Sequence, residues 1–243
     1  FITWTPIADW MGNRTTQYSG TFDGNNKTVS GLYFNGDSTC IGLFGSSESD
    51  GNIKNVGVVD SYFKGNDHVG GVCGNNAGTI TNCYNAGNLT AIESSATIGG
   101  ICGYNNGGTV TNCYNTGTVT ATGSVASVGG VCGRSIELIL NCYNIGTVTA
   151  TSSDADISGI CGYNFGPIKN CYYLADTEDE NGGKTTAQFA SGEVAYLLSQ
   201  GCTVGEGEDA VTYSGSVWGQ ALGGNGDTCL LYTSPSPRDR TRS

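Results

Sequence analysis

The sequence is poor in charged side chains, in proline and in long hydrophobic runs. Charged residues make up 13% of the 243 residues, there are 4 prolines, and the formal net charge is −11. Because an acidic chain without a basic patch has little with which to neutralise phosphates, we expect no nucleic-acid partner. No apolar run is long enough to cross a bilayer, so we expect no membrane-spanning segment. Ordinary disordered chains are charge-rich, which makes disorder a poor explanation for this composition.

Residues that bind metals are also scarce or badly spaced. His68 is the only histidine, and the 11 cysteines lack the short Cys-x-x-Cys pairs of zinc sites. We therefore expect no metal and no other cofactor. The alternative is calcium in the acidic loop from Asp176 to Glu180, although its glycine stands in the wrong place and no distal Glu closes the loop.

The sequence is rich in repetition, with a period of 29 or 30 residues. The motif Gly70-Gly71-Val72-Cys73-Gly74 returns at 99–103 and 129–133, and once more at 158–162 with one glycine lost. A second motif, Asn82-Cys83-Tyr84, returns at 112–114, 141–143 and 170–172. Short segments bounded by Asn and Gly indicate strands, and copies that follow one another without helices indicate a solenoid. We predict an all-β fold, a parallel β-helix of roughly six coils stacked about 4.8 Å apart.

Alignment of the coils predicts interior columns, in which each residue lies above its counterpart in the next coil. One apolar column contains Val29, Ile53, Ile80, Val110, Ile139 and Ile168, and another contains Val59, Leu89, Val119 and Val148. One cysteine column contains Phe44, Cys73, Cys102, Cys132 and Cys161, and the other contains Leu32, Val56, Cys83, Cys113, Cys142 and Cys171. Because large apolar residues share these columns with cysteine, we predict two internal ladders of free thiols, with disulfides between coils as the alternative.

The paired motifs resemble a known repeat. Gly-Gly-Val-Cys-Gly and Asn-Cys-Tyr, with Gly-Thr-Ile/Val-Thr between them, resemble the GLUG-type repeat of large bacterial surface and secreted proteins, including adhesins and some IgA-protease-like chains. Gly42-Leu43-Phe44-Gly45 matches the core that names the repeat. The resemblance implies an extracellular or cell-surface β-helix and brings no catalytic residues with it. The turn at 134–138 departs from the pattern, since Arg-Ser-Ile-Glu-Leu stands in place of the Asn-Gly turn of the other coils.

Composition and the repeat divide the chain into four parts. We expect a lead-in strand region at 1–19, the solenoid at 20–174, and a C-terminal capping segment at 175–228. Within the cap, residues 185–200 predict a short helix that breaks at Ser191-Gly192 and ends at Gly201. Residues 229–243 resemble the translation of a sequencing adaptor, so we expect a non-native tail that packs against nothing, with a disordered polar tail as the alternative. Since the chain begins without Met, we expect a fragment of a longer protein.

Two outward surfaces are candidates for binding. Tyr84, Tyr114, Tyr143 and Tyr172 follow inward cysteines and should form an exposed stack, which either binds sugar rings or only stabilises the solenoid. Ile136, Leu138 and Leu140 occupy or adjoin positions where other coils carry threonine, so they should form an exposed apolar contact patch.

Together these patterns predict a non-catalytic structural or adhesive module of a larger bacterial surface protein. The repeat faces carry Asn and Thr instead of the paired carboxylates of polysaccharide-cleaving sites. The alternatives are a glycan-binding solenoid that uses the tyrosine column and, behind it, a polysaccharide-active β-helix enzyme. The expected partners are a host or matrix glycan or protein, and flanking domains of the same chain.

Overall fold

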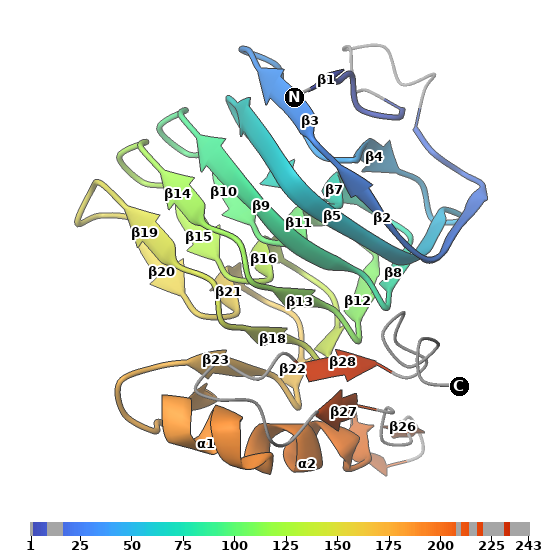
Figure 1. Cartoon of the computed structure of the whole chain (residues 1–243), viewed down its shortest axis with the longest axis vertical. Helices are drawn as coiled ribbons and strands as arrows, with labels where there is room; N and C mark the ends of the chain where they lie inside the picture. The colour runs from blue at the N-terminus through green and yellow to red at the C-terminus, as the bar shows by residue number, and fades with distance from the viewer. Residues whose placement is uncertain (1, 9–16, 208–209, 214–217, 221–230, 234–243) are drawn as a thin grey trace.

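The computed structural model describes residues 2–8, 17–207, 210–213, 218–220 and 231–233. These residues form a parallel β-solenoid of about six turns, with two short helices near the C-terminus, and this confirms the predicted fold class. In Figure 1 the coils run from β2 and β5 to β19 and β23, and the helices lie beneath β23. No helix in the described part of the chain is long and apolar enough to cross a membrane.

The strands of successive coils join into three large sheets and two small ones. The largest sheet contains β1 (Ile2–Thr3), β2 (Thr21–Ser30), β3 (Leu32–Asn35), β5 (Asn52–Gly65), β8 (Thr79–Thr81), β9 (Tyr84–Ala91), β12 (Thr109–Thr111), β13 (Tyr114–Asn115), β14 (Val119–Ala121), β17 (Ile139–Leu140), β18 (Tyr143–Asn144), β19 (Val148–Ala150), β22 (Ile168–Lys169), β23 (Tyr172–Leu174) and β24 (Gly183–Lys184). A second sheet contains β4 (Phe44–Ser47), β7 (Cys73–Asn76), β11 (Cys102–Asn105), β16 (Cys132–Ser135) and β21 (Cys161–Asn164). A third contains β6 (Val69–Gly70), β10 (Thr97–Gly99), β15 (Ser127–Gly129) and β20 (Asp156–Ser158). The two small antiparallel sheets pair β25 (Cys202–Val204) with β26 (Val211–Tyr213), and β27 (Trp218–Gln220) with β28 (Leu231–Thr233). The second of these sheets corrects the expectation that the tail at 229–243 packs against nothing, because the backbone of Leu231–Thr233 pairs with that of Trp218–Gln220.

The register of the central coils follows the predicted columns. Ile80 pairs with Ile53 on one side and Val110 on the other. Cys102 likewise lies between Cys73 and Cys132. The parallel pairing therefore places like residues above like residues, as the 29–30-residue period predicts.

Three assignments in the first coils are wrong. Phe22, and not Val29, pairs with Ile53. Phe63 takes the place predicted for Val59 beside Leu89, and the backbone of Leu32 bonds to Ser61 instead of following the cysteine column. The cause is two irregularities of register, between Asp23 and Lys27 in β2 and between Val59 and Tyr62 in β5. A bulge shifts every later residue of its strand, which a constant repeat length does not reveal.

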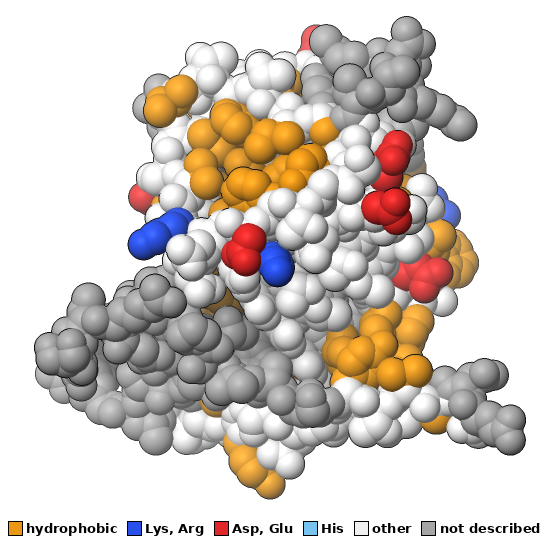
Figure 2. Space-filling view, turned by 90° about the vertical axis from the view of Figure 1, so that its right-hand side faces the viewer, with side chains coloured by type: hydrophobic (Ala, Val, Ile, Leu, Met, Phe, Trp, Pro, Cys, Tyr) orange, Lys and Arg blue, Asp and Glu red, His pale blue; other side chains and the backbone are white. Residues whose placement is uncertain are grey.

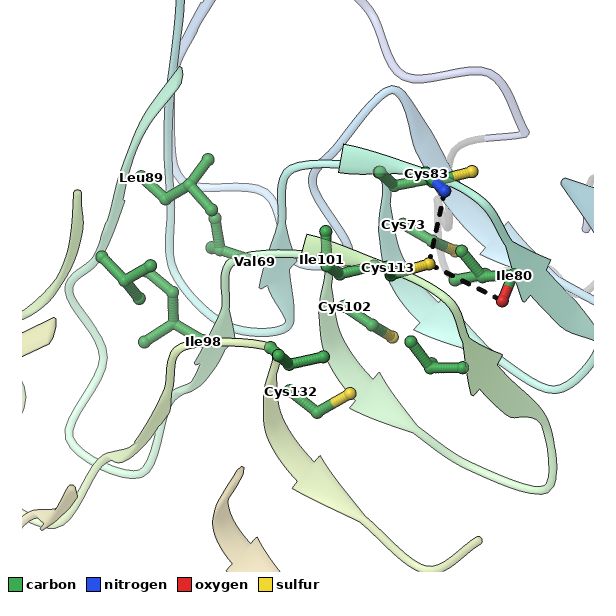
Figure 3. Packing of buried hydrophobic residues seen from close by; sticks show 14 of the residues in the cluster. Val69, Cys73, Ile80, Cys83, Leu89, Ile98, Ile101, Cys102, Cys113 and Cys132 are labelled. Atoms are coloured by element: carbon green, nitrogen blue, oxygen red, sulfur yellow. Dashed lines mark hydrogen bonds between the residues drawn. The ribbon is translucent and has the colours of Figure 1, made fainter. Parts of the chain in front are cut away.

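The interior holds the predicted rows of cysteines side by side (Figure 3). None of the ten described cysteines forms a disulfide, and nine of them are buried. The backbone N–H of Cys83 donates to Cys113 Sγ at 3.4 Å, and that thiol donates to the Thr111 carbonyl at 3.1 Å. Cysteine therefore fills a small apolar site and also satisfies a buried backbone donor, which valine could not do.

The asparagine of each Asn-Cys-Tyr motif turns a corner of the coil. Asn82, Asn112, Asn141 and Asn170 all have φ between 51° and 55°. Asparagine tolerates this left-handed conformation better than most residues. A close approach explains the last glycine of the other motif, because a Cβ on Gly74 would lie 2.4 Å from the backbone carbonyl carbon of Cys40.

Two further ladders of polar side chains run through the stack. Asn85 Nδ2 donates to Asn115 Oδ1 at 2.8 Å, and Asn115 Nδ2 donates to Asn144 Oδ1 at 2.9 Å. On another side, Asn76 Nδ2 donates to Asn105 Oδ1 at 2.9 Å. The divergent turn at 134–138 preserves this second ladder, because Ser135 Oγ accepts from Asn105 Nδ2 at 3.0 Å.

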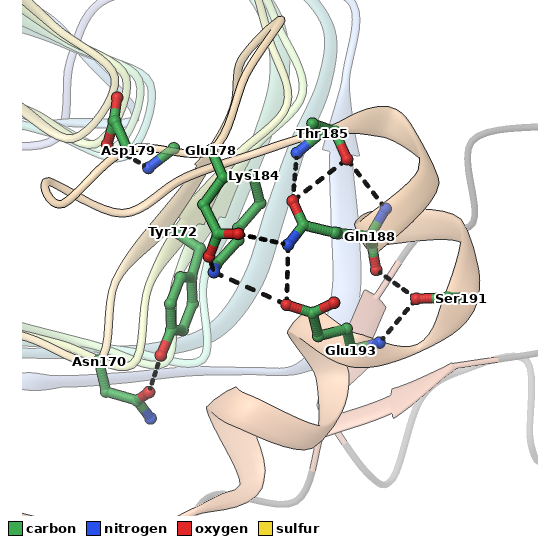
Figure 4. A network of polar contacts seen from close by, with 10 residues as sticks. Asn170, Tyr172, Glu178, Asp179, Lys184, Thr185, Gln188, Ser191 and Glu193 are labelled. Atoms are coloured by element: carbon green, nitrogen blue, oxygen red, sulfur yellow. Dashed lines mark hydrogen bonds and ion pairs between the residues drawn. The ribbon is translucent and has the colours of Figure 1, made fainter.

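The cap contains the predicted helix in two pieces, α1 (Thr186–Ser191) and α2 (Glu193–Ser199). Thr185 and Gln188 form a capping box, and Gly192 breaks the helix with φ of 88°. The end of α2 differs from the prediction, since Gln200, in an extended conformation, caps it in place of Gly201. Figure 4 shows how Lys184 fixes the helices by pairing with Glu178 and, at 3.6 Å, with Glu193.

Candidate binding surfaces

The tyrosines of the repeat form a regular stack outside the solenoid core. The rings of Tyr84 and Tyr114 lie 4.8 Å apart with an interplanar angle of 2°, and those of Tyr114 and Tyr143 lie 4.9 Å apart with the same angle. On the face shown in Figure 2, hydrophobic side chains gather in two areas and charged side chains are few. The stack is therefore continuous from Tyr84 through Tyr114 to Tyr143.

The tyrosine column is not the open platform that the sequence predicts. Tyr143 has no exposed surface and lies in a second core cluster with Phe189, Val194 and Leu198 of the two helices. Tyr114 and Tyr172 pack against the same cluster. The sequence predicts the outward direction correctly, but it does not show that the helices cover this face.

The predicted apolar contact patch is wrong in its exposure. Leu138 and Leu140 are only 7% and 2% exposed, and Ile136 is half-buried. The register itself is as predicted, since Leu140 pairs with Thr111. Neither leucine belongs to the solenoid core cluster, which contains Ile139 between them. Register shows which face of a strand a residue takes, but it does not show whether that face is exposed to solvent.

In the acidic loop considered above for calcium, Asp179 and Glu178 bind other groups of the protein. Asp179 accepts hydrogen bonds from the Tyr173 hydroxyl and, at 2.8 Å, from the backbone N–H of Gly183. Glu178 pairs with Lys184. The hydrogen bond from Tyr173 and the backbone bonds lower the pKa of Asp179. In the described part of the chain, no three His, Cys, Asp or Glu side chains gather as a metal site.

A pocket of about 790 Å³ lies at the last coil. Val148, Ile160, Ile168 and Leu174 line it together with polar and backbone groups. Among the described residues that line it, Glu180 is the one carboxylate, whereas glycoside hydrolysis generally uses two. The geometry of this pocket therefore does not suggest that reaction.

A cluster that the sequence analysis missed lies on the outer face of the second sheet. Arg134 of β16 lies in register between Tyr104 of β11 and Tyr163 of β21. Its guanidinium carbon is 5.1 Å from the ring centre of Tyr104, and 5.6 Å from those of Tyr163 and Phe165. We call these four residues the Arg134 platform. Tyr163 and Phe165 are 43% and 63% exposed, so solvent reaches the platform from the side of the last coil.

The guanidinium of the platform has π contacts but no carboxylate partner among the described residues. The ion pairs of that part of the chain involve Lys54, His68 and Lys184. The Nε of Arg134 is buried without a hydrogen-bond partner, and so is the Oδ1 of Asn75, two coils away in the same column. The position two residues after the motif cysteine carries Asn75, Tyr104, Arg134 and Tyr163 in turn, which is the sequence signal that could have found the cluster.

Comparisons with known proteins agree with the repeat and the fold. A model of the GLUG motif matches residues 94–120. Halomucin of Haloquadratum walsbyi (strain DSM 16790 / HBSQ001) is 37% identical over 89 residues, which is 35% of this chain but 1% of halomucin. A Bacteroides ovatus protein provisionally assigned as an immunoglobulin A1 protease has a similar structure, with a TM-score of 0.61 and 18% identity over 95% of this chain and 81% of that one. At that identity the second likeness shows the fold alone. The chain carries a GLUG motif within a β-solenoid that resembles parts of large proteins.

Proposed function

We propose that this solenoid is a non-catalytic structural and adhesive module of a larger extracellular bacterial protein. The observation that supports this proposal is that the residues repeated from coil to coil have structural tasks. Asparagine forms the corners and the polar ladders, cysteine fills the core, and glycine permits close approach between neighbouring backbone segments. Stacking constrains the repeated positions, whereas residues on the outer faces can differ from coil to coil. A rigid scaffold whose surface can vary suits an adhesive protein.

The halomucin match supports the role of one module among many. This chain spans 1% of the length of that relative, so the matching region is a small part of a large protein. The GLUG motif at 94–120 supports the same reading, because the repeat resembles those of surface and secreted proteins. We therefore also propose that this solenoid lies outside the cell.

The tyrosine column contributes to the structural part of this role. Its rings stack on each other and on the cap, and Tyr143 has no exposed surface. The structure thus favours stabilisation over sugar binding for this column.

The test of the proposal uses intact cells that express the full-length gene. Antibodies raised against the solenoid should label those cells without permeabilisation, and external protease should remove the signal. Labelling that appears only after permeabilisation would refute an extracellular role. Purified protein incubated with a panel of polysaccharides should release no reducing ends, and steady release would refute the non-catalytic assignment.

A further inference from the structure

The Arg134 platform combines a cation, exposed rings and one unsatisfied polar atom, the Nε of Arg134. Its guanidinium lies near three aromatic rings, whereas the cations of the described ion pairs lie beside carboxylates. The net charge of the chain is −11, yet Arg134 has no carboxylate partner among the described residues and its guanidinium lies beside aromatic rings. The aromatic rings hold the cation in position without neutralising it. An anionic group can therefore approach it.

We infer that the Arg134 platform binds an acidic polysaccharide, with Arg134 pairing a sugar carboxylate and the rings of Tyr163 and Phe165 packing against neighbouring sugar faces. A guanidinium offers a planar pair of donors that matches a carboxylate. The negative face of an aromatic ring attracts the polarised C–H bonds of a pyranose. Phe165 stands nearly perpendicular to Tyr163, with ring centres 4.8 Å apart and an angle of 86°, so the two rings form a corner.

The spacing of the platform suits a polymer that lies along the solenoid. Tyr104, Arg134 and Tyr163 belong to three successive coils, whose strands lie about 4.8 Å apart. That rise is close to the length of one sugar in an extended polysaccharide. A chain along this face would meet one platform residue per sugar, with the carboxylate at the coil of Arg134.

The charge of the protein limits the kind of acidic polymer. A net charge of −11 repels a polymer with an anion on every unit, and one arginine cannot compensate for it. For the same reason a nucleic acid is disfavoured. The ligand class that fits best has carboxylate sugars separated by neutral ones, which present one charge to the platform and apolar faces on either side.

This inference deepens the adhesive part of the proposed function and rests on it. The two can fail separately, since location is measured on cells and binding is measured on purified protein.

The test is calorimetric or fluorescence titration of the purified full chain with a ten-sugar fragment of hyaluronan, in which glucuronate alternates with a neutral sugar. Conversion of its carboxylates to methyl esters should weaken binding to the wild type about tenfold or more, since a charge-assisted hydrogen bond is lost. Arg134→Gln should weaken binding of the unmodified fragment by a similar factor. The esterified fragment should bind Arg134→Gln no worse than the unmodified fragment does, because both changes remove the same contact.

Matched variants separate the platform from general effects. Tyr163→Ala and Phe165→Ala should each weaken binding severalfold, whereas Tyr196→Ala, which removes a 65% exposed tyrosine from α2, should leave it unchanged. Absence of binding to wild type, or equal losses on esterification in wild type and Arg134→Gln, would overturn the inference. So would tighter binding to polygalacturonate or single-stranded DNA, or self-association that Arg134→Gln abolishes.

Discussion

Replacement of Asn115 by alanine tests whether the polar ladder holds the coils together. The Asn115 side chain has no exposed surface and makes four hydrogen bonds. Two of them join the ladder to Asn85 and Asn144, and two satisfy the N–H and carbonyl of Gly117 at 3.2 and 3.0 Å. After Asn115→Ala, Asn85 and Asn144 keep their hydrogen bonds to Gly87 and Gly146, the glycines two residues after them. The buried N–H and carbonyl of Gly117 lose their hydrogen bonds to the Asn115 side chain.

The magnitude follows from those two orphaned groups. A buried backbone group without a partner costs about 1–3 kcal/mol, so Asn115→Ala should lower the free energy of unfolding by about 2–6 kcal/mol. For a chain of this size, each kcal/mol corresponds to about 2–4 °C in the midpoint of thermal unfolding. We expect a decrease of about 4–24 °C, measured by circular dichroism on the purified protein and checked by urea denaturation.

Two other asparagines serve as controls for this measurement. Asn144→Ala should cost less, because Asn144 is the last of the ladder and its turn glycine, Gly146, is partly exposed and can bond to water. Asn88→Ala should have little effect, since Asn88 is exposed. Equal midpoints for Asn115→Ala and Asn88→Ala would refute the role of the ladder.

Three further predictions concern the core, the outer face and the cap. Burial raises the pKa of the Cys161 thiol from an ordinary value near 9 to about 12. The contribution of this thiol to stability is therefore complete below pH 9 and is lost as the pH rises toward 12. The midpoint of urea denaturation should fall as the pH rises above 9, and a constant midpoint would contradict the prediction. Leu140→Thr should lower the free energy of unfolding by about 2–4 kcal/mol without changing self-association in sedimentation, whereas the half-buried Ile136→Thr should cost less. Lys184→Met should speed proteolysis within the helices, because it removes the partner of Glu178 and Glu193, and the exposed Lys169→Met should not; equal cleavage rates would argue against the ion pairs as the anchor.

The repeat predicts the central coils well because stacking imposes one register. From Ile80 onward, a residue and its counterpart 29 or 30 positions later meet in neighbouring strands. The first coils fail because bulges near Asn25 and Asp60, both with positive φ, add residues that the period does not include. Such bulges leave no mark in an alignment of motifs.

The candidate surfaces were harder to predict than the fold. Outward direction follows from alternation, which holds for both Tyr143 and Leu140, but both side chains are buried, and the two helices cover Tyr143. The Arg134 platform was overlooked for the opposite reason. Its residues differ from coil to coil, so a search for repetition does not find them, although their positions are equivalent.

The left-handed asparagine corner also bears on how such a gene can change its length. Each corner contacts mainly the equivalent corner above and below, as when Asn141 bonds to Asn112 at 3.2 Å and accepts from Asn170 at 2.8 Å. A duplicated coil would therefore meet the partners that it needs on both sides, wherever recombination inserted it. Each coil gained or lost would change the length of the solenoid by about 4.8 Å and would move any domain attached to its end by the same distance. The number of coils therefore sets the length of the solenoid in small, equal steps.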